Sequence, residues 1–103
     1  MNKELEEISD FVKNSKNKNI ILAGDFNTSP YSYYFKQFTN KIKDSLNNAT
    51  KNKGFLTTWY HEKIPLNTQI DYIFYSKNLI NTNLQSKWTK GADHKGIFAE
   101  FKF

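Results

Sequence analysis

The first apolar residues of the chain recur at helical spacing. One face of a helix would carry four of them: Leu5, Ile8, Phe11 and Val12. Glutamates precede this stripe and lysines follow it, an order that suits the dipole of a helix. The pattern predicts an amphipathic helix over residues 3–15.

The next apolar run, residues 19–24, is short and branched, as is typical of a strand buried on both faces. It ends abruptly at Asp25. Ser29 and Pro30 then predict the start of a second helix, with serine as the N-cap and proline at the first helical position. We expect this helix to continue through the aromatic residues to about Phe38.

Residues 41–53 are polar and rich in asparagine, which predicts a short strand at most, followed by a loop closed by Gly54. Residues 69–75 then alternate strictly, as in a strand. Ile70, Tyr72 and Phe74 point one way, and Asp71, Ile73 and Tyr75 point the other. Two further strands are predicted over residues 84–89 and 97–103, with a turn near Gly91.

A chain of 103 residues with 38% hydrophobic and 17% aromatic residues predicts one soluble structural unit. No apolar run is long enough for a transmembrane helix, so we expect no membrane insertion. Residues 1–10 lack the pattern of a secretory signal, which favours a cytoplasmic protein on the sequence as given. The compartment stays open, because a targeting signal could precede Met1.

Cysteine is absent, so any metal must bind to oxygen or imidazole ligands. The net charge of +5 comes from lysines without arginine, and their even scatter is more typical of a solvated surface than of a phosphate-binding face. A basic, aromatic module that binds nucleic acid remains the alternative. We interpret its candidate stacking residues, Trp59 and the aromatic cluster at 31–35, as core or rim.

Three of the five aspartates interrupt strand-like segments: Asp25, Asp71 and Asp93. Carboxylates rarely enter such positions without a partner. Asp25 and Asn27 lie two residues apart at a strand end, where one can accept a proton and the other can donate to an oxyanion. An Asx turn that satisfies backbone amides is the alternative reading of this pair.

Asp71 has apolar neighbours and therefore needs a partner. A lysine could serve, but a histidine is more suggestive, because a carboxylate fixes the tautomer of an imidazole and favours its charged form. His94, next to Asp93, is the candidate. We interpret His61, in a loop before Pro65, as a surface residue.

Together, these three segments resemble the signature of the endonuclease/exonuclease/phosphatase superfamily. The matching residues are Gly24-Asp25-Phe26-Asn27, the run from Ile70 to Phe74, and Ala92-Asp93-His94, in which alanine replaces the usual serine. The resemblance implies an α/β (α+β) fold, with a mixed or antiparallel sheet and flanking helices. Residues 1–103 would be the C-terminal portion, about half of a four-layer αββα sandwich.

The resemblance also implies roles for five residues. Asp25 would orient or deprotonate the attacking water, and Asn27 would donate to the phosphoryl oxygens. Asp71 would pair with His94, which would contact the scissile phosphate. Asp93 would belong to a divalent metal site for Mg²⁺ or Mn²⁺.

The implied activity is metal-dependent hydrolysis of a phosphodiester or phosphomonoester by an activated water. The substrate stays undetermined among DNA, RNA, lipid headgroups and inositol phosphates. The family's N-terminal half supplies a metal-binding glutamate that has no counterpart here, so we expect the chain alone to be inactive or nearly so. We also expect the missing half, or a second subunit, to cover the exposed face of the sheet.

Overall fold

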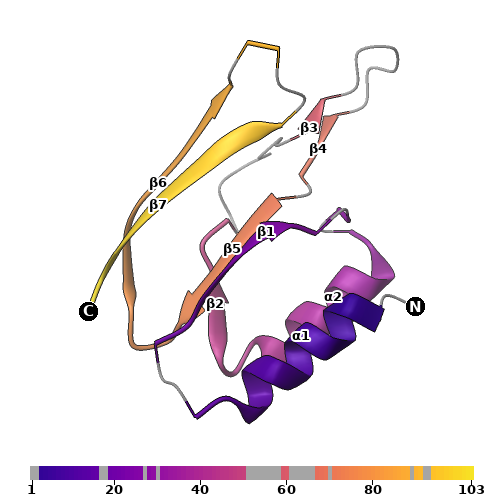
Figure 1. The fold of residues 1–103 in the computed structure, drawn as a ribbon, viewed down its shortest axis with the longest axis vertical. Coiled ribbons are helices and arrows are strands. Elements are labelled where there is room, and N and C mark those ends of the chain that lie inside the picture. The colour runs from indigo at the N-terminus through magenta and orange to yellow at the C-terminus, as the bar shows by residue number, and fades with distance from the viewer. Residues whose placement is uncertain are drawn as a thin grey trace.

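The computed structural model describes residues 3–16, 19–26, 28, 29, 31–50, 59, 60, 67–69, 71–88, 90, 91 and 94–103. They form an α+β fold with antiparallel sheets, as the sequence predicts. Two helices run along one side of a three-stranded sheet, and a long hairpin lies on the other side (Figure 1). Within the described residues, no helix is long and apolar enough to span a membrane.

Helix α1 covers Lys3–Asn14, close to the predicted range. Its buried positions are Leu5, Ser9 and Val12, so the apolar stripe faces the core. The hydroxyl of Ser9 donates to the carbonyl of Glu6 at 2.8 Å, which allows this polar side chain to be buried.

Helix α2 covers Tyr33–Ile42, and its predicted start at Ser29 and Pro30 is wrong. The N-cap is Ser32, whose side chain accepts from the backbone N–H of Phe35 and so satisfies one free donor at the helix end. Ser29 lies in the preceding turn, where its carbonyl accepts from the N–H of Ser32 at 3.1 Å. The helix also ends four residues later than expected.

The main sheet contains β1 (Ile21–Asp25), β5 (Asp71–Ser76) and β2 (Leu46–Asn48), in the order β1-β5-β2. Both pairings are antiparallel. The expectation that the first strand is buried on both faces is wrong. In the described sheet β1 is an edge strand, and Ile21 is 53% exposed.

The remaining strands form two antiparallel pairs. β3 (Trp59–Tyr60) pairs with β4 (Asn67–Thr68), and neither was expected from the sequence. β6 (Ile80–Trp88) pairs with β7 (Lys95–Lys102) in a long hairpin. The β6 strand begins four residues before the predicted start, with a register irregularity between Asn81 and Asn83.

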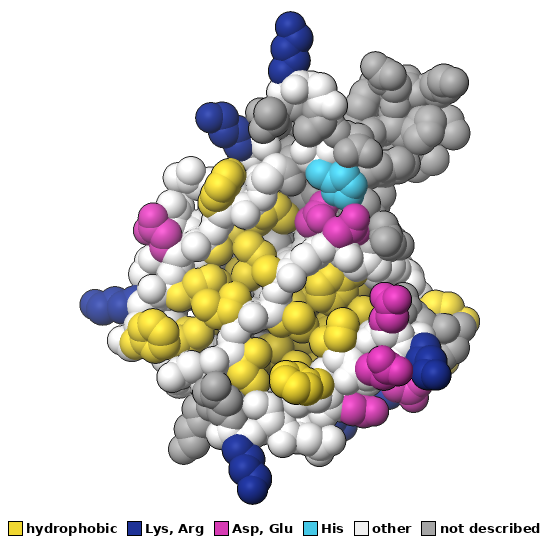
Figure 2. Space-filling model, viewed as in Figure 1, with side chains coloured by type: hydrophobic (Ala, Val, Ile, Leu, Met, Phe, Trp, Pro, Cys, Tyr) yellow, Lys and Arg dark blue, Asp and Glu magenta, His cyan; other side chains and the backbone are white. Residues whose placement is uncertain are grey.

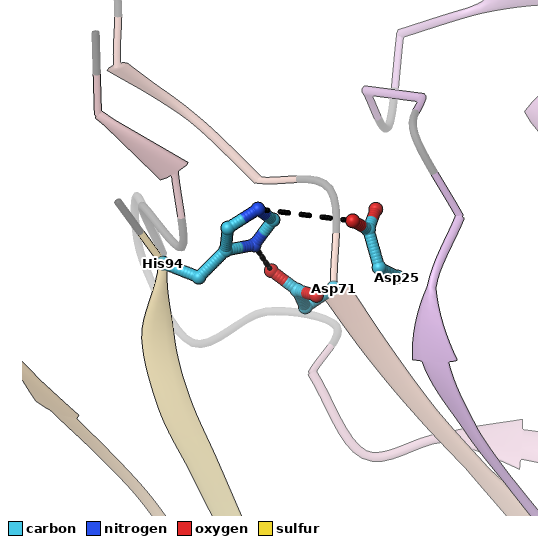
Figure 3. Close-up of side chains that lie close together, drawn as sticks. All are labelled: Asp25, Asp71 and His94. Carbon is cyan, nitrogen blue, oxygen red and sulfur yellow. Dashed lines mark hydrogen bonds and ion pairs between the residues drawn. The ribbon is translucent and has the colours of Figure 1, made fainter. Parts of the chain in front are cut away.

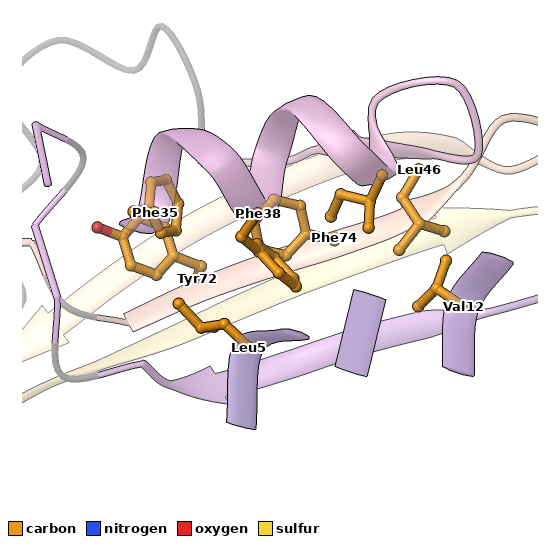
Figure 4. Packing of buried hydrophobic residues seen from close by; sticks show 8 residues of the cluster. Leu5, Val12, Phe35, Phe38, Leu46, Tyr72 and Phe74 are labelled. Atoms are coloured by element: carbon orange, nitrogen blue, oxygen red, sulfur yellow. The ribbon is translucent and has the colours of Figure 1, made fainter. Parts of the chain in front are cut away.

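The core lies between the sheet and the two helices (Figure 4). Tyr72 and Phe74 of β5 are each 1% exposed and pack against rings from α2, Tyr72 in a stacked pair and Phe74 in a T-shaped pair. Phe35 lies 4.3 Å from Tyr72 between ring centroids, and Phe38 lies 5.6 Å from Phe74. This aromatic packing supplies much of the buried apolar area that holds the helices on the sheet.

The other face of the sheet is also apolar but less covered. Tyr75 contacts Phe101 of the hairpin, with ring centroids 5.1 Å apart. Ile73 is 8% exposed, whereas Ile21 on the neighbouring strand is largely open. Figure 2 shows hydrophobic side chains gathered over the middle of one face of the molecule, next to a histidine and acidic side chains.

Candidate active site

The site begins where two antiparallel strands meet at one end of the main sheet. β1 ends at Asp25 and β5 begins at Asp71, and the two residues are direct partners in the register. Side chains of direct partners point to the same face of a sheet and lie close together. The fold therefore places both carboxylates on the face opposite the helices.

His94 approaches this pair from the third segment, immediately before β7. Its Nδ1 lies 2.9 Å from Oδ2 of Asp71 (Figure 3). The ring N–H donates and the ionised carboxylate accepts, which fixes the orientation of the imidazole. The contact between Asp71 and His94 that the sequence predicts is present.

The turn before His94 depends on Gly91, whose φ of 88° lies in the left-handed region. A side chain at this φ would strain the backbone, so glycine suits the turn that returns the chain from β6 to β7. Gly91 thereby helps to set the point at which the histidine meets the sheet.

The second ring nitrogen of His94 faces the other carboxylate. Nε2 lies 3.7 Å from Oδ2 of Asp25, an ion-pair distance longer than a hydrogen bond. Only the imidazolium has two N–H donors, so only the charged ring presents a donor toward both carboxylates. The ring of His94 thus lies between the two carboxylates, with one ring nitrogen toward each of them.

The three side chains differ in their exposure to solvent. Asp71 is 18% exposed, whereas His94 and Asp25 are 32% and 39% exposed. Asp71 therefore lies beneath the ring, and the side with Nε2 and Asp25 is open. A ligand that enters from solvent would meet these two groups first.

The structure adds two aromatic residues that sequence reasoning did not place in the site. Phe26 follows Asp25 directly, and its ring packs against the core, 5.4 Å from Tyr72 and 5.5 Å from Phe38. The Tyr72 hydroxyl donates toward the carbonyl of Thr28 at 2.7 Å. The sequence signal for this bond was a tyrosine among the apolar residues of one strand face, because a buried hydroxyl needs a hydrogen-bond partner.

The environment of Tyr72 also changes its acidity. Burial raises the pKa of the phenol well above the ordinary value of 10.0, and the neighbouring carboxylate of Asp71 raises it further. The hydroxyl therefore stays protonated and remains a donor throughout the physiological range.

The donor chemistry of the site fits a divalent cation. Asp25, Asp71 and His94 each offer one ligand atom, and these atoms lie within 4.8 Å of one another. Carboxylate oxygens are the ligands that Mg²⁺ prefers, and Mn²⁺ also accepts an imidazole, which binds a metal only in its neutral form.

Several of the predicted residues lie outside the described part of the chain. They are Asn27, Asp93, Ala92 and His61. Asn27 lies between Phe26 and Thr28 in the sequence, and Asp93 directly precedes His94. The structure thus brings together Asp25, Asp71 and His94 from three separate segments.

The chain matches the profile of a known protein family. The profile of a family described as the Endonuclease/Exonuclease/phosphatase family matches residues 4–94 of this 103-residue chain. No significant match was found among curated proteins or among solved structures. The matched range includes all three segments that form the site, and the chain belongs to the endonuclease/exonuclease/phosphatase family.

Proposed function

We propose that the chain carries part of the active site of a metal-dependent phosphoesterase, which hydrolyses a phosphodiester or a phosphomonoester with an activated water. The proposal depends mainly on the arrangement of three side chains, in which His94 lies between Asp25 and Asp71. Nε2 of the histidine and the carboxylate of Asp25 are on the side that is more exposed to solvent. The family match supports the same reaction class.

In this proposal His94 binds the scissile phosphate. Its Nε2–H donates to a phosphoryl oxygen and stabilises the negative charge that develops as water attacks. Asp71 accepts from Nδ1 at 2.9 Å, which holds the ring in place and keeps it charged. Asp71 thus acts through the histidine and does not touch the substrate.

Asp25 lies on the other side of the Nε2 atom, 3.7 Å away. A carboxylate at this position can orient a water molecule and accept its proton as the water attacks phosphorus. We assign Asn27, two residues later, to donate from its amide to a phosphoryl oxygen. Both roles need a pose in which the phosphate lies against the open edge of the sheet.

Asp93 would hold the metal ion, for which Mg²⁺ or Mn²⁺ is the suitable class. When bound, such an ion supplies a Lewis acid that withdraws charge from the phosphoryl oxygens. Few carboxylates are available for this role, so we propose weak metal binding and very slow turnover for the chain alone. A further segment or a second subunit would complete the site.

The test is hydrolysis of bis-p-nitrophenyl phosphate at high protein concentration with millimolar Mg²⁺. We expect slow release of nitrophenol that stops on chelation, and that falls to the buffer rate in Asp25→Ala and in His94→Ala. Asp44→Ala is the matched control, because Asp44 is an exposed carboxylate in the turn after α2. A measurable wild-type rate that is unchanged in Asp25→Ala would contradict the proposal.

A second measurement covers turnover too slow to detect. Inorganic phosphate with Mg²⁺ should shift the imidazole resonances of His94 in the NMR spectrum, and the shift should be lost in Asp71→Ala. A chain that neither hydrolyses the ester nor binds phosphate at His94 would overturn the proposal. Salt-sensitive binding of nucleic acid that ignores Asp25 and His94 would instead support the basic binding module.

A further inference from the structure

Tyr72 joins the two backbone segments that flank the carboxylate pair. Its hydroxyl lies 2.7 Å from the carbonyl oxygen of Thr28, which follows β1, and 3.1 Å from that of Gln69, which precedes β5. Both partners are acceptors, so one hydroxyl hydrogen is shared, with the shorter bond to Thr28. Thr28 lies 44 residues away in the sequence.

The ring of Tyr72 is held as firmly as its hydroxyl. It is stacked on Phe35 with centroids 4.3 Å apart, it contacts the edge of Phe26 at 5.4 Å, and it is 1% exposed. A ring fixed in this way presents its hydroxyl at a constant position. The side chain of Tyr72 therefore connects the aromatic core, which its ring contacts, with the end of the sheet, where its hydroxyl forms hydrogen bonds.

The segment before β5 is held by a second hydrogen bond. The side-chain amide of Gln69 donates to the carbonyl of Asp71 at 3.2 Å. Gln69 is thus held to Tyr72 by its backbone and to Asp71 by its side chain. The bond from Gln69 thus holds the backbone of the residue whose carboxylate contacts His94.

From these contacts we infer that Tyr72 is a positioning residue of the proposed active site: its hydroxyl fixes the segment after Asp25 against the segment before Asp71. This inference rests on the proposed function for its catalytic consequence. The role is separate from the packing of the ring, because a phenylalanine would keep every ring contact and lose only the hydroxyl.

Asp25 precedes Thr28 by three residues, and Phe26 between them is anchored in the core. Loss of the bond to Thr28 would remove the contact that holds the backbone after Phe26. Misplacement of reacting groups by fractions of an ångström lowers turnover more than it lowers substrate binding. The expected change is therefore in kcat and not in KM.

The test compares Tyr72→Phe with Tyr75→Phe. Tyr75 lies on the same strand, faces the opposite side and contacts Phe101, so it matches the chemistry of the change without touching Thr28. Amide hydrogen exchange at Ser32 reports on the segment, because its N–H donates to the carbonyl of Ser29. We expect faster exchange there in Tyr72→Phe and unchanged exchange in Tyr75→Phe.

The second readout is hydrolysis of bis-p-nitrophenyl phosphate with Mg²⁺ by the same variants. We expect kcat to fall between about tenfold and a hundredfold in Tyr72→Phe, with KM within about twofold of the wild type. Wild-type kinetics in Tyr75→Phe are the control. Circular dichroism and the melting temperature verify that both variants are folded.

The outcomes separate this inference from the proposed function. Unchanged exchange at Ser32 in Tyr72→Phe overturns the inference, whatever the activity. Faster exchange with the same kcat in both variants also overturns it, because the segment would then be loose without effect on the reaction. A wild-type chain without hydrolysis or phosphate binding overturns the proposed function, and the exchange measurement then decides alone whether Tyr72 holds the segment.

Discussion

The two faces of β5 serve different purposes. Tyr72 and Phe74 point toward the helices and are almost fully buried in an aromatic core, whereas Asp71 and Tyr75 point the other way and are partly exposed. Asp71 on the second face binds His94. Because side chains of a strand alternate with period two, one short segment can stabilise the fold with one set of residues and position the groups of the proposed active site with the other.

Mutations on the two faces should therefore separate stability from activity. The largest expected effect is on the helix-covered face, in Phe74→Ala. Removal of a buried phenylalanine leaves a cavity among the rings of Phe26, Phe38 and Tyr72, and we expect a loss of about 3–5 kcal/mol in the free energy of unfolding.

Urea denaturation followed by circular dichroism measures this change, and for a small domain the loss approaches the whole stability. The matched control is Phe98→Ala, because Phe98 is 59% exposed. We expect a change within about 0.5 kcal/mol there. Similar losses in both variants would mean that the core does not lie where the structure places it.

The next effect is on the open face, in Asp71→Asn. The amide keeps the size of the carboxylate but removes the negative charge that accepts from His94, so we expect hydrolysis to fall about a hundredfold. The free energy of unfolding should change by less than about 1 kcal/mol, because the pair is partly exposed. A variant with wild-type activity would show that the contact has no part in the reaction.

The smallest effect concerns pH and the buried phenol of Tyr72 on the helix-covered face. The pKa of Tyr72 is raised in the folded chain, so the folded state keeps a proton that the unfolded state loses above the ordinary value of 10.0. The stabilisation is present in full below that pH and is lost as the pH rises toward the folded-state pKa, by at most about 1.4 kcal/mol per pH unit.

Denaturation curves of the wild type and Tyr72→Phe test this expectation. They are measured between about pH 9 and pH 11.5, a range that brackets the ordinary pKa of tyrosine. The wild type should lose stability more steeply than the variant, since only the wild type has this phenol. Parallel curves would indicate that the phenol is not buried.

The sequence predicts those helices and strands that are determined by neighbouring residues in the chain. The amphipathic stripe of α1 and the alternation of β5 follow from periodicity alone, and both are confirmed. The start of α2 was wrong because Ser29 and Ser32 are both suitable caps, and the choice depends on which N–H each side chain reaches. The exposure of β1 was missed because an edge position depends on the order of strands, which no short segment encodes.

The candidate site shows the same division. The contact between Asp71 and His94 could be predicted, because a carboxylate with apolar neighbours needs a partner. The hydroxyl bond of Tyr72 could not, because its partners are backbone carbonyls and the nearer one belongs to Thr28, 44 residues away. Every residue has such a carbonyl, so nothing in the sequence distinguishes this one.

The most direct test of the account measures activity and stability in the same samples of wild type and His94→Ala. The measured quantity is the Mg²⁺-dependent rate of bis-p-nitrophenyl phosphate hydrolysis, with a urea denaturation curve for each protein. We predict that the rate falls to the buffer level while the free energy of unfolding stays within about 1 kcal/mol of the wild type. An undiminished rate in His94→Ala would contradict the account.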